Sequence, residues 1–244
     1  FVCRFRGMRK DIQMEVYRLD EKKNQWVSGS IVDGGFWPLA TPIRMNDGNW
    51  IMAGAILNGE NPGAVAISHG NNFLKWDIVT IPKPPNMTMW GETAVIVNGK
   101  QVTAITRYGA KALALGALSN DYGRTWTVSN ESNLPMTTSK PYAGILSTGQ
   151  RYLICTTTAD SGKHRWPLTI AVSSTSEGLF SKVYRIRDGV APHDEDKKPA
   201  ALSYPYAFER KGKLYISYSV GHLGGNRNAL ELAVIPVAAF SGGE

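Results

Sequence analysis

The sequence predicts an all-β fold built from repeated antiparallel units, and three observations lead to this expectation. The 244 residues include 25 glycines and 13 prolines, and no long segment has the hydrophobic period of an amphipathic helix. Short apolar segments of strand length alternate with turn sequences. One turn sequence, SNDYGRTWT at residues 119–127, recurs in partial form at two other places. Since 43% of the residues are hydrophobic, the chain can also bury a sizeable core.

Four glycines mark predicted hairpin turns. Each follows a short apolar segment and precedes another, as in a β-hairpin closed by a tight turn. They are 51, 50 and 63 residues apart, and they are Gly48, Gly99, Gly149 and Gly212. A further strand pair is expected upstream, at residues 12–17 and 25–27.

A third strand is expected about twenty residues after each turn glycine. Three of these strands end in a serine that opens a copy of the recurring turn, at Ser68, Ser119 and Ser173. A unit of about 50 residues with three or four antiparallel strands cannot bury both faces alone, which is typical of a propeller blade. The predicted fold class is therefore an all-β β-propeller with four to five blades visible in this chain; a β-sandwich is the alternative. The four third strands are residues 64–68, 115–119, 169–173 and 230–235.

The complete copy of the turn resembles the Asp box of the sialidase (neuraminidase) superfamily, S-x-D-x-G-x-T-W. Ser119, Asp121, Gly123, Thr125 and Trp126 match it position for position. The box is a structural turn located away from the catalytic face in that family, so it indicates a fold rather than a chemistry. The resemblance implies a sialidase-type propeller, which has six blades in the family. We expect residues 1–244 to form one such domain without its N-terminal blade or blades.

Two charged residues at the second hairpin resemble the sialidase pattern. Glu92 begins the hairpin and Arg107 ends its return strand, so both lie on the same side of it. In sialidases the glutamate polarises a tyrosine nucleophile and the arginine binds the substrate carboxylate, and the resemblance implies these roles for Glu92 and Arg107. The alternative is an exposed cross-strand ion pair, worth less than about 1 kcal/mol.

Arg165 begins the pattern R-x-x-L-T-I-x-x-S, which leads into the third copy of the turn. This pattern resembles the sialidase segment that carries another carboxylate-binding arginine. A guanidinium group can bind a carboxylate through two parallel hydrogen bonds, which lysine cannot do. The alternative is a surface-loop arginine with no fixed partner.

Two tyrosines lie near the start of the last hairpin, where the family places its nucleophile. Tyr204 and Tyr206 lie eight and six residues before Gly212, whereas Glu92 lies seven before Gly99, so spacing does not choose between them. A phenol with a pKa near 10 needs a neighbouring carboxylate to take its proton. It is nevertheless suited to an anionic sugar, which repels a carboxylate nucleophile. Tyrosines that pack a blade interior are the alternative.

Weaker candidates complete the predicted site. Tyr142 lies seven residues before Gly149, the offset of Glu92, and is expected to contact substrate. Asp33 is a candidate acid–base residue. His193, in a charged loop, is a candidate substrate contact or the catalytic group of a different sugar hydrolase or lyase. The first arginine of the family's triad has no clear match, because no R-I-P segment is present; Arg4, Arg6 and Arg9 are possible substitutes.

The formal charge of +7 favours an anionic partner, and an acidic glycan is preferred to nucleic acid because the charge is spread along the chain. Cys3 and Cys155 lack metal-ligand spacing, so neither a metal nor another cofactor is expected. No apolar run reaches the roughly 18 residues of a membrane span, so no membrane partner is expected. No signal-peptide pattern is present, and the start of the chain is that expected of a processed or incomplete protein. Secretion or a periplasmic location is implied by the resemblance, and the oligomeric state stays open.

The resemblance implies a retaining glycoside hydrolase that removes a terminal acidic, sialic-acid-like sugar. Tyr204 or Tyr206 attacks, Glu92 assists, and Arg107 and Arg165 bind the carboxylate. Two alternatives stay open: a hydrolase or lyase of uronate-containing glycans on the same propeller, and a propeller that binds glycans without cleaving them.

Overall fold

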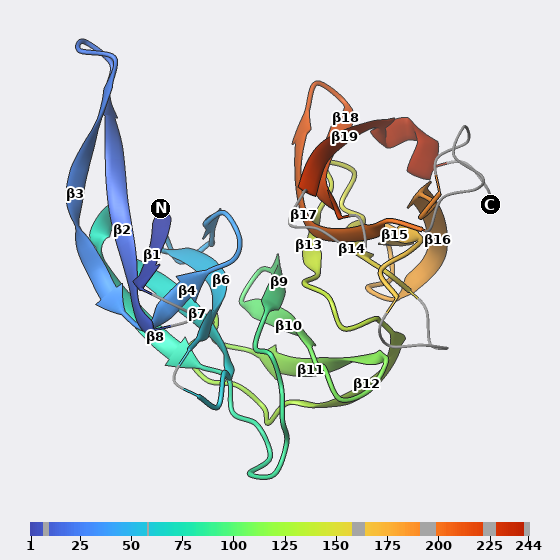
Figure 1. Cartoon of the computed structure of the whole chain (residues 1–244), viewed down its shortest axis with the longest axis horizontal. Helices are drawn as coiled ribbons and strands as arrows, with labels where there is room; N and C mark the ends of the chain where they lie inside the picture. The colour runs from blue at the N-terminus through green and yellow to red at the C-terminus, as the bar shows by residue number, and fades with distance from the viewer. Residues whose placement is uncertain (7–9, 58, 158–163, 191–198, 222–227, 242–244) are drawn as a thin grey trace. The chain divides into compact units, whose positions relative to one another are not determined.

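The computed structural model describes residues 1–244 except 7–9, 58, 158–163, 191–198, 222–227 and 242–244. The described residues form nineteen strands in five sheets and one 3₁₀ helix, η1 (Val237–Phe240). Each sheet follows chain order from strand to strand with antiparallel neighbours (Figure 1). The predicted class, an all-β propeller of sialidase type, is confirmed. No described helix has the length and apolar character needed to cross a membrane.

The chain divides into two compact units. The first comprises Phe1–Thr106 and Gly116–Asn130, and the second Arg107–Leu115 and Glu131–Glu244. One sheet contains residues of both units, in the order β12 (Asn130–Pro135), β11 (Leu113–Ser119), β10 (Gln101–Arg107), β9 (Thr93–Asn98).

The first unit contains two further sheets. One has the order β1 (Val2–Arg6), β2 (Lys10–Asp20), β3 (Gln25–Gly34), so the strand pair predicted upstream is present and longer than expected. The other has the order β4 (Phe36–Pro38), β6 (Trp50–Ile56), β7 (Gly63–His69), β8 (Asn72–Thr80), with β5 (Ile43–Arg44) also paired to β6.

The central strands β6 and β7 are buried on both faces. Ile51 and Val65 belong to a core cluster that also contains side chains of β9, β10 and β11, whereas Met52 and Ala64 belong to a cluster on the opposite face with Met14. A strand covered on both sides has a continuous apolar sequence rather than an alternating one. This is why these segments read as uninterrupted apolar runs, as expected for a propeller blade.

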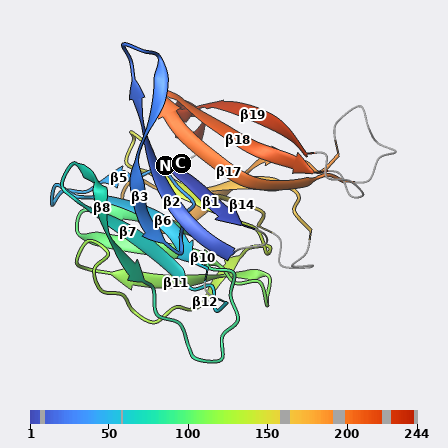
Figure 2. The same cartoon turned by 60° about the vertical axis from the view of Figure 1, so that its left-hand side comes forward.

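The second unit contains a four-stranded and a three-stranded sheet. The first has the order β13 (Tyr142–Ile145), β14 (Arg151–Cys155), β15 (Leu168–Ser173), β16 (Phe180–Arg187). The second has the order β17 (Ala201–Arg210), β18 (Lys213–Gly221), β19 (Asn228–Pro236), and these strands lie side by side in both views (Figures 1 and 2). Cys155 is a buried free thiol, and burial raises its pKa to about 12.

The four predicted hairpin turns are all present. At the first, the N–H of Met45 donates to the carbonyl of Asn49 at 2.8 Å, and at the third, the N–H of Leu146 donates to the carbonyl of Gln150 at 2.8 Å. Gly48 and Gly149 occupy the same position in these turns, with φ of +87° and +86°, where a side chain would be strained. The two turns are therefore copies of one another in geometry.

The repeated serines also have a shared role. The hydroxyl of Ser68 accepts the N–H of Trp50 at 2.8 Å, and that of Ser173 accepts the N–H of Arg151 at 2.9 Å. Each bond joins the end of the third strand of a sheet to the start of its second strand. The spacing of Ser68 and Ser173 thus reflects a contact that is repeated in these two blades.

Asp121 organises the complete Asp box. Its carboxylate accepts the N–H groups of Arg124 and Thr125 at 3.1 and 2.9 Å and the Thr125 hydroxyl at 2.6 Å. These hydrogen bonds, the Thr125 hydroxyl foremost, lower the pKa of Asp121 to about 2. At Gly123, φ is +82° and a Cβ would lie 2.8 Å from Cδ1 of Ile51. The turn is therefore a structural element packed against the β6 sheet.

Candidate functional site

Two predicted carboxylate-binding arginines meet at one residue of the second unit. The Nε of Arg107, a buried side chain at the end of β10, donates to the Thr138 hydroxyl at 3.0 Å. The Nη2 of Arg165 donates to the Thr138 carbonyl oxygen at 3.3 Å. The structure therefore brings Arg107 and Arg165 together, although 58 positions separate them in the sequence.

Two further hydrogen bonds to backbone carbonyl groups join the segments that carry these contacts. The Thr137 hydroxyl donates to the carbonyl of His164 at 2.6 Å, next to Arg165. On the other side, the N–H of Leu202 in β17 donates to the carbonyl of Arg165 at 2.8 Å. The Arg165 backbone is thus held between the segment before β13 and the first residues of β17.

Tyr204 stands on a bulge in β17. Ser203 pairs with Ser219 and Tyr206 with Ser217, so two residues of β17 oppose one residue of β18. Tyr204 has φ of +54°, a left-handed conformation that is uncommon for a residue with a side chain. Its side chain is half exposed, and the Cζ of Arg165 lies 5.9 Å from its ring centre. The bulge therefore presents a phenol next to one of the paired arginines.

Lys140 lies beneath the same bulge. Its side chain is 2% exposed, and its Nζ donates to the Pro205 carbonyl at 3.1 Å. The same Nζ lies 4.0 Å from the ring centre of Tyr206 and 5.4 Å from that of Tyr142. The two rings are themselves in contact, with centroids 5.4 Å apart. Burial, and then the neighbouring Tyr142 phenol, raise the pKa of Tyr206.

This group of six side chains, the arginine–tyrosine cluster, has a defined chemical capacity. Two guanidinium groups and one ammonium group create a positive field, which suits a carboxylate ligand. The tyrosines add aromatic surface, and the side chains of Tyr204 and Tyr206 are both partly exposed. The cluster consists of Arg107, Lys140, Tyr142, Arg165, Tyr204 and Tyr206.

Glu92 belongs to the other compact unit. It directly precedes β9 and is half-buried, and it lines a small cavity in which the other lining side chains are aromatic or aliphatic, among them Trp37 and Trp90. The following residue, Thr93, is fixed by a 2.9 Å hydrogen bond between its hydroxyl and that of Thr106. The backbone at Glu92 is thus well supported, and its predicted catalytic role stays a prediction.

The remaining predicted residues lie where side chains are not described. Asp33 is in β3, and its backbone is paired with Met14. Arg4 and Arg6 are in β1, next to β2. Arg9 and His193 lie outside the described residues. Their proposed roles therefore stay predictions from the sequence.

Two members of the site region were missed from the sequence. Thr138 and Lys140 lie in the connection between β12 and β13, which has no repeat and no hydrophobic period. One feature of the sequence was visible: Lys140 directly precedes Pro141 and Tyr142, and Tyr142 is the first residue of β13. This feature alone does not predict that the lysine is buried. In this segment the spacing from the turn glycine predicts only Tyr142 as a site residue.

Another group in the same unit, made of a tyrosine, a glutamate and an arginine, has a structural role. Arg187 donates from Nε and Nη2 to Glu231 at 3.0 and 3.3 Å, and the Tyr218 phenol donates to Glu231 at 2.9 Å. Tyr218 is 3% exposed, and burial with this hydrogen bond raises its pKa to about 12. A buried phenol with a raised pKa is poorly suited to attack a sugar, so this group joins β16, β18 and β19 rather than forming a reactive centre.

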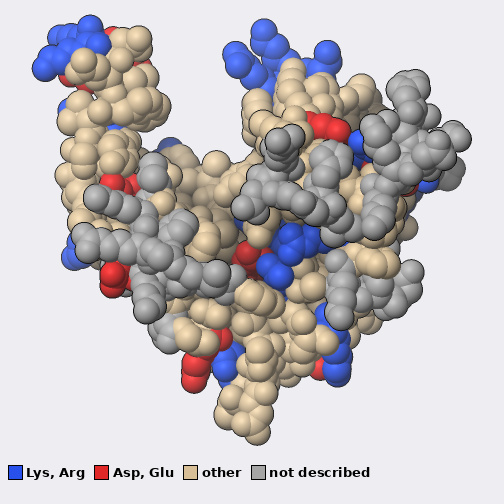
Figure 3. All heavy atoms as spheres, viewed as in Figure 1, with Lys and Arg blue, Asp and Glu red and all other residues tan. Residues whose placement is uncertain are grey.

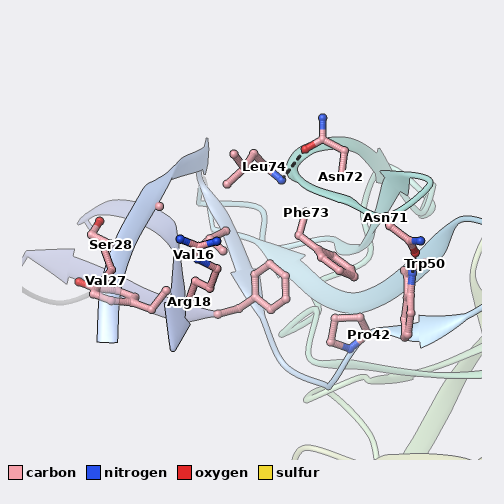
Figure 4. Close-up of a pocket in the computed structure, with 13 residues that line it drawn as sticks. Val16, Arg18, Val27, Ser28, Pro42, Trp50, Asn71, Asn72, Phe73 and Leu74 are labelled. Carbon is pink, nitrogen blue, oxygen red and sulfur yellow. Dashed lines mark hydrogen bonds between the residues drawn. The ribbon is translucent and has the colours of Figure 1, made fainter. Parts of the chain in front are cut away.

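The first unit contains an apolar groove of about 660 Å³. Phe73 and Trp50 line one side, and Val27 and Arg18 of the β2–β3 hairpin line the other (Figure 4). None of its described lining residues is Asp, Glu or His, so the groove itself supplies no acid–base pair. The arginine–tyrosine cluster is therefore the better candidate for chemistry.

On the face shown in Figure 3, Lys and Arg side chains form several separate groups, with Asp and Glu among them. A continuous basic stripe, the usual electrostatic signature of a nucleic-acid-binding surface, is not visible on this face.

Comparisons with known proteins support the fold. A family model described as BNR repeat-like domain matches residues 6–216. A search of curated proteins finds no match. Among solved structures, a protein of unknown function from Dyadobacter fermentans is 16% identical with a TM-score of 0.69, and the alignment covers 91% of this chain and 63% of that one.

Two enzymes are also similar in structure. An intramolecular trans-sialidase from Ruminococcus gnavus, solved with oseltamivir carboxylate, is 14% identical with a TM-score of 0.66, over 93% of this chain and 51% of that one. An α-L-arabinanase from Penicillium chrysogenum, solved with arabinobiose, is 15% identical with a TM-score of 0.54, over 93% of this chain and 86% of that one.

These identities support a shared fold and no more. The chain spans 63% of the length of the Dyadobacter fermentans protein and 51% of the trans-sialidase. The family model, by contrast, covers most of the chain. The chain therefore belongs to the BNR repeat-like domain family, and its fold is a sialidase-like β-propeller.

Proposed function

We propose that this chain carries the substrate-binding and nucleophilic part of a retaining glycoside hydrolase that removes a terminal carboxylate-bearing sugar, such as a sialic acid. The observation that carries the proposal is the contact of Arg107 and Arg165 with the same residue, Thr138, next to the half-exposed Tyr204. The similarity of the fold to that of a trans-sialidase supports the same class of substrate.

The paired arginines are assigned to the substrate carboxylate. Thr138 holds Arg107 through its Nε, and Arg165 through one Nη2 contact to a carbonyl oxygen. Guanidinium groups fixed in this way lose little side-chain entropy when they bind an anion. They would orient the sugar so that its anomeric carbon faces a neighbouring side chain.

Tyr204 is assigned as the nucleophile in preference to Tyr206. Tyr204 stands on the bulge in a left-handed conformation, a type of local strain that often occurs at functional sites. The pKa of Tyr206 is raised by burial, which disfavours the phenolate needed for attack, and its ring is occupied by Lys140.

The reaction then proceeds in two displacements. The Tyr204 phenol oxygen bonds to the anomeric carbon as the bond to the leaving oxygen breaks, and an acid protonates that oxygen. Water then attacks the same carbon as the ionised acid takes its proton, the bond to the Tyr204 oxygen breaks, and that oxygen regains a proton from the protonated base. The two displacements retain the anomeric configuration. From the family resemblance, Glu92 takes the phenol proton and Asp33 is the acid; both assignments stay predictions.

A hydrolase or lyase acting on uronate-terminated glycans is the second candidate. The same observation favours it, because a uronate carries a carboxylate that a pair of guanidinium groups would bind equally well. Product analysis separates the two enzymes, since hydrolysis releases a free acidic sugar whereas elimination leaves an unsaturated uronate that absorbs in the ultraviolet.

The proposal is tested with 4-methylumbelliferyl glycosides of N-acetylneuraminic acid, glucuronic acid and arabinofuranose. We expect fluorescence release from the neuraminic acid glycoside and none from the neutral arabinoside, with activity lost in the double variant Arg107→Lys, Arg165→Lys. Turnover of the arabinoside alone would contradict the assignment of the arginines. Binding of N-acetylneuraminic acid without cleavage of any glycoside would instead support a glycan-binding propeller.

A further inference from the structure

We propose that Lys140 is a positioning residue that holds the β17 bulge in the shape that presents Tyr204. The inference rests on the proposed function where it concerns catalysis, because it takes Tyr204 as the nucleophile. Its structural part, that Lys140 maintains the bulge, is independent of any activity.

The contacts of Lys140 converge on the residues that follow Tyr204. Its Nζ donates to the carbonyl oxygen of Pro205 at 3.1 Å and lies 4.0 Å from the ring centre of Tyr206. Proline has no N–H to give to the strand ladder, which is why it is tolerated where β17 departs from regular pairing. Lys140 therefore binds the bulge through the carbonyl oxygen of Pro205.

A second ring, that of Tyr142 on strand β13, also contacts the ammonium group of Lys140. Tyr142, the first residue of β13, lies 5.4 Å from Nζ, and its ring contacts that of Tyr206. Cation–π attraction depends on distance from the ring face, so two rings and one carbonyl fix the position of the Nζ atom closely. Since Pro141 and Tyr142 follow Lys140 directly, the start of β13 and the bulge in β17 are joined through this side chain.

The Lys140 ammonium group makes contacts that a neutral apolar side chain of the same length lacks: a hydrogen bond to the Pro205 carbonyl and cation–π contacts with two rings. A buried ammonium group is favourable only when its protons are hydrogen-bonded or lie against π faces, so it is held firmly once those groups surround it. With 2% exposure, Lys140 is screened from solvent. Because its Nζ is already bound by the Pro205 carbonyl and two ring faces, Lys140 acts through the bulge and not by contact with the sugar.

The bulge shape matters because Tyr204 has φ of +54°, a conformation that the chain does not adopt without support. If the Pro205 carbonyl were released, β17 could return to regular pairing and the Tyr204 side chain would change direction. A displacement of about 1 Å at a reacting group can reduce the rate by about 100-fold. Substrate held by Arg107 and Arg165 would still bind.

The test compares Lys140→Met with Lys213→Met, an exposed lysine on β18 of the same unit. Both variants are assayed with the neuraminic acid glycoside and solved by crystallography alongside the wild type. We expect Lys140→Met to lower kcat by at least about 30-fold with KM within about threefold of wild type, because only the reacting group is misplaced. Tyr204 should leave the left-handed region in its crystal structure, and Lys213→Met should match the wild type in both respects.

Three outcomes overturn the inference. The first is an unchanged kcat, and the second is a rise in KM alone, which would make Lys140 a substrate contact. The third is a Lys140→Met structure in which φ of Tyr204 stays near its wild-type value. If the wild type cleaves no acidic glycoside, the proposed function fails, while the crystal structures still decide the role of Lys140.

A second variant covers the case in which Lys140→Met does not fold. Tyr206→Leu keeps the lysine and removes the ring that lies 4.0 Å from its Nζ. We expect the Nζ–Pro205 contact to loosen and the bulge to change in the same direction. A Tyr206→Leu structure in which the Nζ–Pro205 contact is lost while the bulge and φ of Tyr204 are unchanged would overturn the inference.

Discussion

The Nε of Arg107 donates a hydrogen bond to the Thr138 hydroxyl at 3.0 Å, and this contact ties the end of β10 to the segment that precedes β13. Because Arg107 is buried, its guanidinium group depends on such contacts to keep one orientation. Removing the Thr138 hydroxyl should therefore loosen the Arg107 guanidinium group.

Thr138→Val removes the hydroxyl acceptor and keeps the shape of the side chain. Arg165 keeps its bond to the Thr138 carbonyl oxygen, so only one of the two guanidinium groups loses its support. Loss of one hydrogen bond to a charged group predicts a rise of about 5- to 20-fold in KM for the neuraminic acid glycoside, with kcat nearly unchanged. Thr148→Val, an exposed threonine of the same unit, is the control, and equal KM values in the two variants would contradict the prediction.

The choice between the two tyrosines predicts unequal effects of removing each hydroxyl. Tyr204→Phe should lower kcat by at least about 1,000-fold, because no covalent intermediate can form. Tyr206→Phe keeps the ring that contacts Lys140 and should lose less than about tenfold. A fluorinated acidic glycosyl fluoride that traps the intermediate, followed by peptide mass spectrometry, should label Tyr204. Label on Tyr206, or the reverse order of activities, would show that the assignment is wrong.

The ambiguity between these tyrosines in the sequence has a physical cause. Spacing from the turn glycine locates a side chain only while the strand pairs regularly, and β17 inserts an extra residue between Ser203 and Tyr206. Counting back from Gly212 therefore fails beyond the bulge. The turns themselves were predictable, because Gly48, Gly149 and Asp121 act on neighbouring residues of their own segments.

The arginine–tyrosine cluster was predictable only in part. Arg107 and Arg165 stand out because Arg107 is the last residue of β10 and Arg165 lies three residues before β15. Thr138 and Lys140 lie in a connection where no period or turn motif constrains the residue type, and their importance depends on which distant groups surround them. Tertiary proximity of this kind is not encoded in local patterns, so these residues could be identified only from the structure.

Glu92→Gln tests the proposed role of Glu92 as the base that takes the phenol proton. If Glu92 takes the phenol proton, the amide should lower kcat by at least about 100-fold, because it cannot act as a base. The affinity for N-acetylneuraminic acid, measured by calorimetry, should stay within about threefold. Glu21→Gln, an exposed residue in the turn after β2, is the matched control. A fall in kcat of less than tenfold would exclude Glu92 as the base.

Asp121 predicts a pH-dependent contribution to stability that is unrelated to activity. Its pKa in the folded chain is about 2, below its ordinary value of 3.8, chiefly because its ionised carboxylate accepts the Thr125 hydroxyl and two N–H groups. A group whose pKa is lower in the folded state stabilises the fold fully above its unfolded pKa. That stabilisation is lost as the pH falls through the folded pKa.

Asp121→Asn should therefore destabilise the chain at neutral pH by about 2 kcal/mol, because charged hydrogen-bond acceptors become neutral. For a chain of this length the loss corresponds to a Tm lower by about 4 to 8 °C. The difference in Tm between wild type and variant should be constant above about pH 5 and shrink progressively between about pH 4 and pH 2, where the wild-type carboxylate takes up a proton. Thr125→Val, which removes only the hydroxyl donor to Asp121, should show the same trend with a smaller amplitude. A Tm difference that stays constant down to pH 2 would mean that the Asp box is held by its backbone turn and by the packing of Gly123 on Ile51, and not by the charge of Asp121.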